Sequence, residues 1–211
     1  MQTKVVKIDP FQIDENEMKE AAELIRKGEL VAFPTETVYG LGADALHPEA
    51  SKKIYAAKGR PSDNPLIVHI CKFEELVSIA KEVPAQAEKL ADAFWPGPLT
   101  MIVWKNEKVP YETTGGMETV AIRMPKHPVA LKLIEESGCL IAAPSANISG
   151  KPSPVKIEDT IKDFKDKVDA FIDGGICKES IPSTIVKVID GKIEILRKGV
   201  ISIEDIKNKI M

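Results

Sequence analysis

The sequence predicts an α/β protein with an open, twisted, mixed sheet flanked by helices. Helix-type and strand-type segments alternate along most of the 211 residues, and 44% of the residues are hydrophobic, which is enough for a sizeable core. Asp190-Gly191 separates two strand-type segments and predicts an antiparallel hairpin near the C-terminus. Because no linker, repeat or abrupt charge shift divides the chain, we expect one domain over residues 1–211.

The N-terminal half begins with a predicted helix. Asp14 and Glu17 form a capping box, apolar residues recur at helical spacing after them, and Gly28 is placed to end the helix. A strand follows at residues 30–33, and the polar segment 34–42 after it predicts a strand end that opens into a loop. The further elements expected here are a helix at 48–57, a buried strand at 66–70, and two helices within 73–94 separated around Pro84.

The C-terminal half continues the alternation. Strands at 99–104 and 119–123 flank a Gly115-Gly116 turn, and a helix at 128–136 stops at Gly138. A strand at 140–143 leads into residues 144–153, which are too rich in Gly, Pro and Ser for regular structure. The hairpin strands are expected at 183–189 and 192–197, and a last short helix begins near Ser202.

Charge and cysteine content restrict the class of protein. A net charge of -3 excludes a polycation that coats nucleic acid, so any anion site must be local. Three cysteines without a CxxC pair argue against a disulfide framework and a structural zinc site. Residues 1–10 contain no stretch resembling a signal peptide, and no window approaches the roughly 20 apolar residues of a membrane span. We expect a soluble cytoplasmic protein that does not associate with membranes.

Familiar catalytic motifs give little support for a nucleotide-binding loop, a serine acyl enzyme or a metal site. The chain has no P-loop, and the GxGxx(G/A) match at residues 40–45 lacks a helix that starts inside it, since Pro48 more naturally opens the next helix. Ser78 and Lys81 have SxxK spacing, but they lie in an amphipathic helix without companion motifs. The histidines at 47, 69 and 127 are isolated, so we expect no protein-held metal.

Cationic and polar residues gather at predicted strand ends and loops. They are Lys58, Arg60 and Asn64, then Arg123, Ser145 and Asn147, and finally Arg197, with His69 at the end of its strand. Crevices outside strand ends are where open α/β sheets bind ligands. Three arginines and a lysine from distant segments therefore indicate a polyanionic ligand.

A set of motifs in fixed order carries a family resemblance. They are Phe33-Pro34-Thr35-Glu36-Thr37-Val38-Tyr39-Gly40-Leu41-Gly42, Lys58-Gly59-Arg60-Pro61, Asn64-Pro65-Leu66-Ile67-Val68-His69, Trp95-Pro96-Gly97-Pro98-Leu99-Thr100, Arg123-Met124-Pro125 and Pro144-Ser145-Ala146-Asn147-Ile148-Ser149-Gly150. From about Asp14 to Arg197 the chain resembles the threonylcarbamoyl-AMP synthase family, the YrdC-like domain. The resemblance implies a YrdC-like fold and a nucleotidyltransferase that condenses L-threonine, bicarbonate or CO2, and ATP into threonylcarbamoyl-AMP and pyrophosphate.

The resemblance also implies a distribution of roles. Thr37, His69, Arg123, Ala143 and Ser183 would bind L-threonine, with Arg123 as a bidentate fork on its carboxylate. Lys58 and Arg60 would be the catalytic cations on the phosphates. ATP would be bound by Arg60, Asn64, Thr119, Ser145, Asn147, Ser153 and Arg197. No protein nucleophile is needed, and Mg²⁺ is expected on the triphosphate, held mainly by phosphate oxygens and water.

The same resemblance implies partners for the protein, and two other functions remain as alternatives to the synthase. The product would pass to a downstream threonylcarbamoyl transferase that modifies the tRNA adenosine next to the anticodon, and tRNA itself is a candidate partner on this basis. The chain ends soon after Arg197, so we expect a single-domain form or the synthase part of a longer protein. An RNA-binding module without synthase activity ranks second, because 5% aromatic residues offer few stacking platforms. A carbamoyl-transfer domain of the hydrogenase-maturation type is a further alternative, although no acylphosphatase-like or zinc-finger segment accompanies it.

Overall fold

The fold is built around one mixed sheet. A computed structural model describes residues 3–210. Its strands are, in chain order, β1 (Lys4–Lys7), β2 (Val31–Phe33), β3 (Gly40–Asp44), β4 (Ile67–His69), β5 (Leu99–Trp104), β6 (Thr119–Arg123), β7 (Ile141–Ala142), β8 (Ala170–Asp173), β9 (Thr184–Ile189) and β10 (Lys192–Arg197). They are hydrogen-bonded in the order β1-β8-β2-β3-β7-β4-β6-β5-β9-β10. Parallel pairs, such as β4 with β6, and antiparallel pairs, such as β5 with β6, both occur in it, so the expected open mixed sheet is confirmed.

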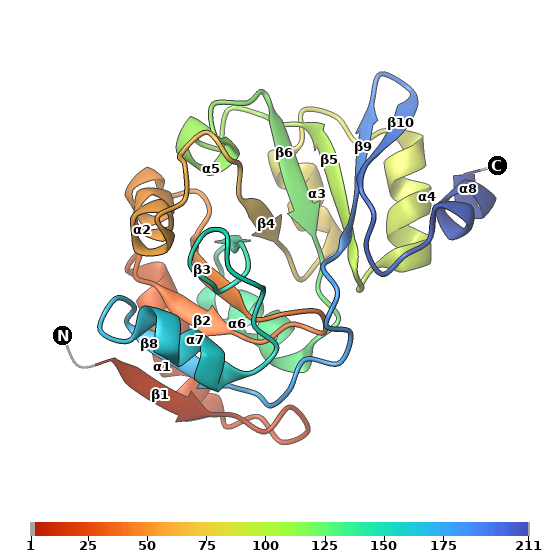
Figure 1. The fold of residues 1–211 in the computed structure, drawn as a ribbon. Coiled ribbons are helices and arrows are strands. Elements are labelled where there is room, and N and C mark those ends of the chain that lie inside the picture. Colours follow the sequence, from red (N-terminus) through yellow and green to blue (C-terminus); the bar gives the residue numbers. More distant parts are fainter. Residues whose placement is uncertain (1–2, 211) are drawn as a thin grey trace.

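Helices cover the sheet and create two separate cores. They are α1 (Glu15–Arg26), α2 (Pro48–Lys58), α3 (Phe73–Ile79), α4 (Ala85–Phe94), α5 (Tyr111–Thr114), α6 (Pro128–Ser137), α7 (Ile157–Phe164) and α8 (Ile203–Ile210). α1 packs on α6 over a smaller core that includes Met18, Phe33 and Leu133. α4 and α8 lie beside the β9–β10 hairpin, far from β1 at the other side of the molecule (Figure 1). None of the helices within residues 3–210 is long and apolar enough to cross a membrane.

Most predicted elements are confirmed, and their ends have the expected chemistry. Asp14 caps α1 by accepting hydrogen bonds from the backbone N–H groups of Asn16 and Glu17. The hairpin forms around Asp190 and Gly191, both of which have positive φ, as a two-residue turn of this kind requires. The sheet, the flanking helices and the antiparallel C-terminal hairpin therefore follow the predicted fold class.

The prediction of a loop over residues 34–42 is wrong at its end, because β3 begins at Gly40. A Cβ atom at Gly42 would lie 2.6 Å from Phe33 Cε1 and 2.7 Å from Ile141 Cγ2. The glycine therefore permits close packing across the strand rather than a turn. Because Gly40 and Gly42 lie within a strand, no helix begins in the GxGxx(G/A) segment, in agreement with the low weight given to a dinucleotide site.

Candidate active site

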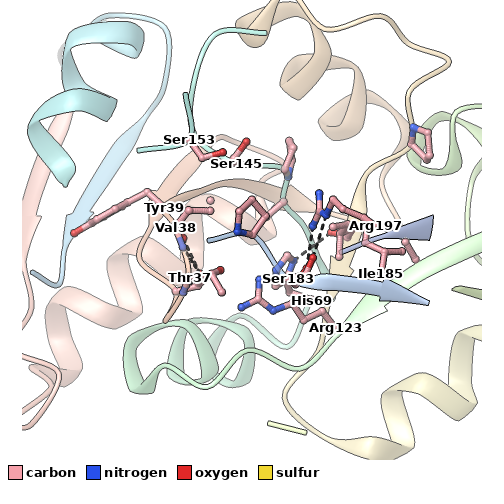
Figure 2. A pocket seen from close by; sticks show the side chains of 18 of the residues that line it. Thr37, Val38, Tyr39, His69, Arg123, Ser145, Ser153, Ser183, Ile185 and Arg197 are labelled. Carbon is pink, nitrogen blue, oxygen red and sulfur yellow. Dashed lines mark hydrogen bonds between the residues drawn. The ribbon is translucent and has the colours of Figure 1, made fainter. Parts of the chain in front are cut away.

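A cavity of about 230 Å³ opens where β4, β6 and β10 end beside two loops (Figure 2). Its lining is Thr35, Thr37, Val38, Tyr39, Gly40, Arg60, Asn64, Pro65, Ile67, His69, Ile102, Ala121, Arg123, Ala143, Pro144, Ser145, Ser153, Pro182, Ser183, Ile185 and Arg197. All predicted site residues except Lys58, Thr119 and Asn147 are among them. The chain thus brings together groups that are far apart in the sequence.

The pleat of the sheet selects which strand residues face the cavity. Side chains alternate between the two faces of a strand, so residues two apart share a face. In the parallel pair β4 and β6, His69 is in register with Arg123, and Ile67 is in register with Ala121. All four line the cavity, whereas the residues between them are buried in the core. The imidazole and the guanidinium are therefore neighbours because of strand register.

Arg197 reaches the cavity because β10 contains a bulge. The register shifts between Ile195 and Arg197, so that Arg197 rather than Leu196 pairs with Ile185, a cavity-lining residue of β9. Its Nε donates to the Ser183 carbonyl oxygen at 3.0 Å, and its Nη2 donates to Ser183 Oγ at 3.0 Å. Ser183 Oγ lies 2.7 Å from Thr100 Oγ1. This network holds a guanidinium and a hydroxyl at the same wall of the cavity (Figure 2).

Thr35 organises the loop between β2 and β3. Its hydroxyl donates to the Val38 carbonyl oxygen at 2.6 Å and accepts from the backbone N–H groups of Thr37 and Val38 at 3.2 Å each. The Thr37 hydroxyl, which is fully buried, lies 3.0 Å from it. A threonine hydroxyl that bonds its own loop in this way replaces a backbone turn. The loop therefore presents Thr37 in one fixed position.

Arg60 is held by neutral groups from the segment that follows α2. Its Nε donates to the Asn64 carbonyl oxygen at 3.0 Å, and its Nη2 donates to Asn64 Oδ1 and to the Pro65 carbonyl oxygen. Within residues 3–210, neither Arg60 nor Arg197 has a carboxylate partner. Burial lowers the pKa of both guanidiniums, and nearby Arg123 and Arg60 lower the pKa of Arg197 further. Such a group of uncompensated cations attracts anions.

Arg123 differs from the other two arginines because it is paired. Its Nη2 lies 2.7 Å from Oε1 of Glu36, and the two side chains are only 5% and 11% exposed. Its Nε donates to the Gly97 carbonyl oxygen at 3.3 Å. Glu36 was not predicted as a functional residue, although it stands inside the first motif. The residues around Glu36 in the sequence do not indicate that it pairs with an arginine as distant in the chain as Arg123.

His69 is a neutral side chain in this environment. It is 3% exposed, and burial, aided by Arg123, lowers its pKa to about 3. Nδ1 lies 3.2 Å from the Ile67 carbonyl oxygen. A neutral imidazole placed in this way is assigned its proton on Nδ1, which leaves Nε2 as a hydrogen-bond acceptor.

Substituting His69 with glutamine is expected to make stability less sensitive to acid. In the unfolded chain His69 has its ordinary pKa of 6.5, whereas the folded value is about 3. Between these values the unfolded state binds the additional proton, so His69 makes the free energy of unfolding fall with decreasing pH by up to roughly 1.4 kcal/mol per pH unit. Urea unfolding of both proteins from about pH 7 to pH 4 measures this. Parallel profiles would contradict the assignment.

Lys58 and Asn147 are not among the residues that line the cavity but belong to the packing of the loop of residues 144–153, which we call the second loop. Lys58 is 1% exposed, and its Nζ donates to the carbonyl oxygens of Ser145 and Asn147, both at 2.5 Å. Burial, with a smaller contribution from Arg60, lowers its pKa to about 8. The Asn147 side-chain amide donates to the carbonyl oxygens of Ile148 and Lys151. Both residues therefore shape the loop that presents Ser145.

Thr119 lies farther from the cavity than predicted. It is the first residue of β6, opposite Trp104, and is two positions before the lining residue Ala121. It shares the face of the strand with Ala121 but lies beyond the end of the lining. Residues that line the cavity without having been singled out include Thr35, Tyr39, Pro182 and Ile185. Thr35 and Tyr39 stand in the first motif, and Pro182 and Ile185 lie within two positions of Ser183, so neighbourhood in the sequence was the only available signal.

Comparison with known proteins shows which family model and which proteins the chain matches. A family model named Sua5_yciO_yrdC and described as telomere recombination matches residues 23–199. The chain is 53% identical to the threonylcarbamoyl-AMP synthase of Pyrococcus abyssi over 199 residues, and 49% identical to that of Bacillus subtilis over 200 residues. Each match covers 94% of this chain and 58% of the relative, so the chain spans little more than half the length of these proteins.

A solved structure agrees with the sequence matches. The crystal structure of P. abyssi Sua5 complexed with L-threonine superposes with a TM-score of 0.96 and 51% identity, covering 99% of this chain and 61% of that one. The resemblance inferred from the ordered motifs is thereby confirmed. The chain belongs to the Sua5/YciO/YrdC family.

Proposed function

We propose that this protein is a threonylcarbamoyl-AMP synthase, which converts L-threonine, bicarbonate and ATP into threonylcarbamoyl-AMP and pyrophosphate. The observation that carries the proposal is the cavity itself, where two guanidiniums that have no carboxylate partner within residues 3–210 stand beside buried hydroxyls and a neutral imidazole. The cations suit a triphosphate, and the hydroxyls suit a small polar amino acid. The names of the P. abyssi and B. subtilis relatives, and the threonine in the P. abyssi Sua5 complex, support the same reaction.

The threonine would occupy the half of the cavity at β4 and β6. Thr37 and Ser183 would hydrogen-bond it, His69 Nε2 would accept a hydrogen bond, and Ala143 would contribute backbone. Nε of Arg123 already donates to Gly97, and its Nη2 faces Glu36. Nη1 is therefore the nitrogen with both N–H groups available, and a bidentate fork on the carboxylate would use it together with the second N–H of Nη2.

The nucleotide would occupy the half formed by Arg60, Arg197 and the second loop. The hydroxyls of Ser145 and Ser153 and the side chain of Asn64 would bind ATP there, as predicted from the sequence. We assign Lys58 and Asn147 to this half through the loop that they hold rather than through the cavity surface. Thr119 would contact the nucleotide only if ATP extends out of the cavity past Ala121.

The chemistry needs positioning and charge stabilisation rather than a protein nucleophile. The threonine ammonium loses one proton to solvent, and the resulting neutral amine attacks bicarbonate to form an N-carboxylate and water. The carboxylate oxygen then attacks the α-phosphorus, and the bond to the bridging oxygen breaks with release of pyrophosphate. Arg60 and Arg197 would stabilise the negative charge that develops on the phosphates, and the buried hydroxyls would orient the amino acid.

Mg²⁺ would enter with the triphosphate. The described residues contain no group of three or more His, Cys, Asp or Glu side chains that could hold a metal, and the carboxylate next to the cavity, Glu36, faces Arg123. This donor set does not fit a resident cation held by the protein. Phosphate oxygens and water are the ligands that suit Mg²⁺ in such a site.

An RNA-binding role without catalysis has less support. Arg123 is 4% exposed and is paired with a carboxylate, so it is not available to a nucleic-acid backbone. The close relatives named as synthases also count against a hydrogenase-maturation domain. We further propose that the protein acts in the cytoplasm and that its product goes to a transferase that modifies tRNA.

The proposal is tested by pyrophosphate release with ATP, bicarbonate and threonine omitted one at a time. We expect release only when all three are present, and serine or valine in place of threonine serves as the control for the amino-acid half. Release without threonine, or tight RNA binding with a steep salt dependence and no binding of ATP or threonine, would contradict it.

A further inference from the structure

The charges around the cavity are paired unequally. Arg60 and Arg197 donate only to carbonyl, amide and hydroxyl oxygens in the described structure, so their half of the cavity has two positive charges. Arg123 has the carboxylate of Glu36 at 2.7 Å, so the other half has a net charge near zero. One cavity thus contains two regions of different charge.

The carboxylate of Glu36 acts on the cavity through Arg123. Glu36 is not a lining residue, and its Oε1 lies 2.7 Å from Nη2 of the lining residue Arg123. Neither of its oxygens accepts a well-formed hydrogen bond from any residue in the described part of the chain, and Nδ1 of the nearby His127 lacks a partner there as well. Since burial removes most solvent screening, the ion pair is the main compensation for both charges.

The loop around Glu36 fixes the position of this carboxylate. Thr35 and Thr37 on either side are joined by their hydroxyls at 3.0 Å, and the Glu36 carbonyl oxygen accepts from the backbone N–H of Glu179 at 3.0 Å. The segment that contains Glu179 therefore closes over the loop. Glu36 has little freedom to leave Arg123.

We propose that Glu36 is a specificity-determining positioning residue that keeps phosphate out of the amino-acid half of the cavity. Resting on the proposed function, this assigns the zwitterionic amino acid to the neutral half and the triphosphate to the dicationic half. A guanidinium without a counter-charge binds phosphate as readily as carboxylate. Without Glu36, three such guanidiniums would form one continuous phosphate site, and phosphate would compete with threonine.

Inorganic phosphate tests this assignment by its pattern of inhibition. In the unmodified protein, phosphate should compete with ATP, and added threonine should not relieve the inhibition. In Glu36→Gln, which keeps the shape and removes the charge, phosphate should also compete with threonine, with an inhibition constant lower by about tenfold. A merely structural defect would weaken binding and would not create a new phosphate site.

Two further variants keep the test decisive. Glu36→Asp retains the charge and should keep the original inhibition pattern even if turnover falls. Glu49→Gln is the matched control, because it breaks an ion pair of the same 2.7 Å separation on the surface. The original pattern in folded Glu36→Gln, or competition with threonine in Glu36→Asp, would overturn the proposal.

Calorimetry separates this inference from the proposed function. If the unmodified protein released no pyrophosphate, the synthase assignment would fail. The number of phosphate ions bound per protein would still show whether Glu36 keeps phosphate out of the amino-acid half of the cavity. We expect one additional phosphate bound by Glu36→Gln relative to the unmodified protein. Equal stoichiometry would count against the role of Glu36 whether or not the enzyme is active.

Discussion

Replacement of Arg123 with alanine is expected to lower the free energy of unfolding by roughly 3–5 kcal/mol, the loss typical of breaking a buried ion pair from one side. The variant leaves the Glu36 carboxylate without its 2.7 Å partner in a place where neither oxygen has another hydrogen-bond donor among the described residues. It also removes the guanidinium from the proposed threonine site. Urea unfolding measures the first effect, and threonine binding to the folded fraction measures the second.

The control for this result is Arg26→Ala. Arg26 Nη2 lies 2.7 Å from Glu23, but these side chains are 41% and 47% exposed. Exposed pairs contribute only about 0–1 kcal/mol, so the control should change stability far less. A double variant that replaces both Glu36 and Arg123 with apolar residues of similar size should recover much of the lost stability. Equal losses of unfolding free energy in Arg123→Ala and Arg26→Ala would show that breaking the buried pair costs no more than breaking an exposed one.

Arg60→Ala should lower threonine-dependent pyrophosphate release by at least about 10²-fold, as expected when a hydrogen-bond donor to developing negative charge is removed. The fold should remain intact, because the partners of Arg60 are the neutral atoms of nearby Asn64 and Pro65 rather than a buried carboxylate. Steady-state rates and circular dichroism together measure both parts of this expectation.

Arg60→Lys provides the comparison for that variant. Lysine keeps the charge but loses the planar fork that bonds the Asn64 and Pro65 oxygens, so an intermediate rate is expected. Unchanged turnover in Arg60→Ala would remove this residue from the proposed phosphate site. A rate in Arg60→Lys as low as that of Arg60→Ala would show that geometry rather than charge sets the contribution.

Local chemistry explains which parts of the fold could be predicted. α1 has its cap and its apolar spacing within one short segment, and the β9–β10 hairpin has its turn residues between two strand patterns. β1 and β8 were not predicted, because they pair with each other across most of the chain length and β1 buries only Val6. A short edge strand with one buried side chain, such as β1, and a mostly buried run of only four residues, such as β8, both give almost no periodic signal.

The same distinction applies to the site. His69 and Arg123 could be placed near each other because both end strands, and the register of β4 with β6 makes them neighbours. The partnership of Glu36 with Arg123 could not be predicted, because it joins a loop residue to the last residue of a strand that is distant in the sequence. The contact of Lys58 with the second loop has the same origin, since its bonds are to backbone oxygens that no residue pattern identifies.

The extra residue in β10 has a consequence for how the last strand tolerates changes in length. Deleting Leu196 would remove the bulge and leave Arg197 opposite Ile185, whereas adding a residue would move Arg197 past Ile185 and turn its side chain toward the opposite surface of the hairpin. The cavity has only two arginines without a carboxylate partner among residues 3–210, so an insertion that turned Arg197 away would halve that charge at one step. Deletion of the bulged residue should therefore be tolerated far better in this short strand than an insertion before Arg197.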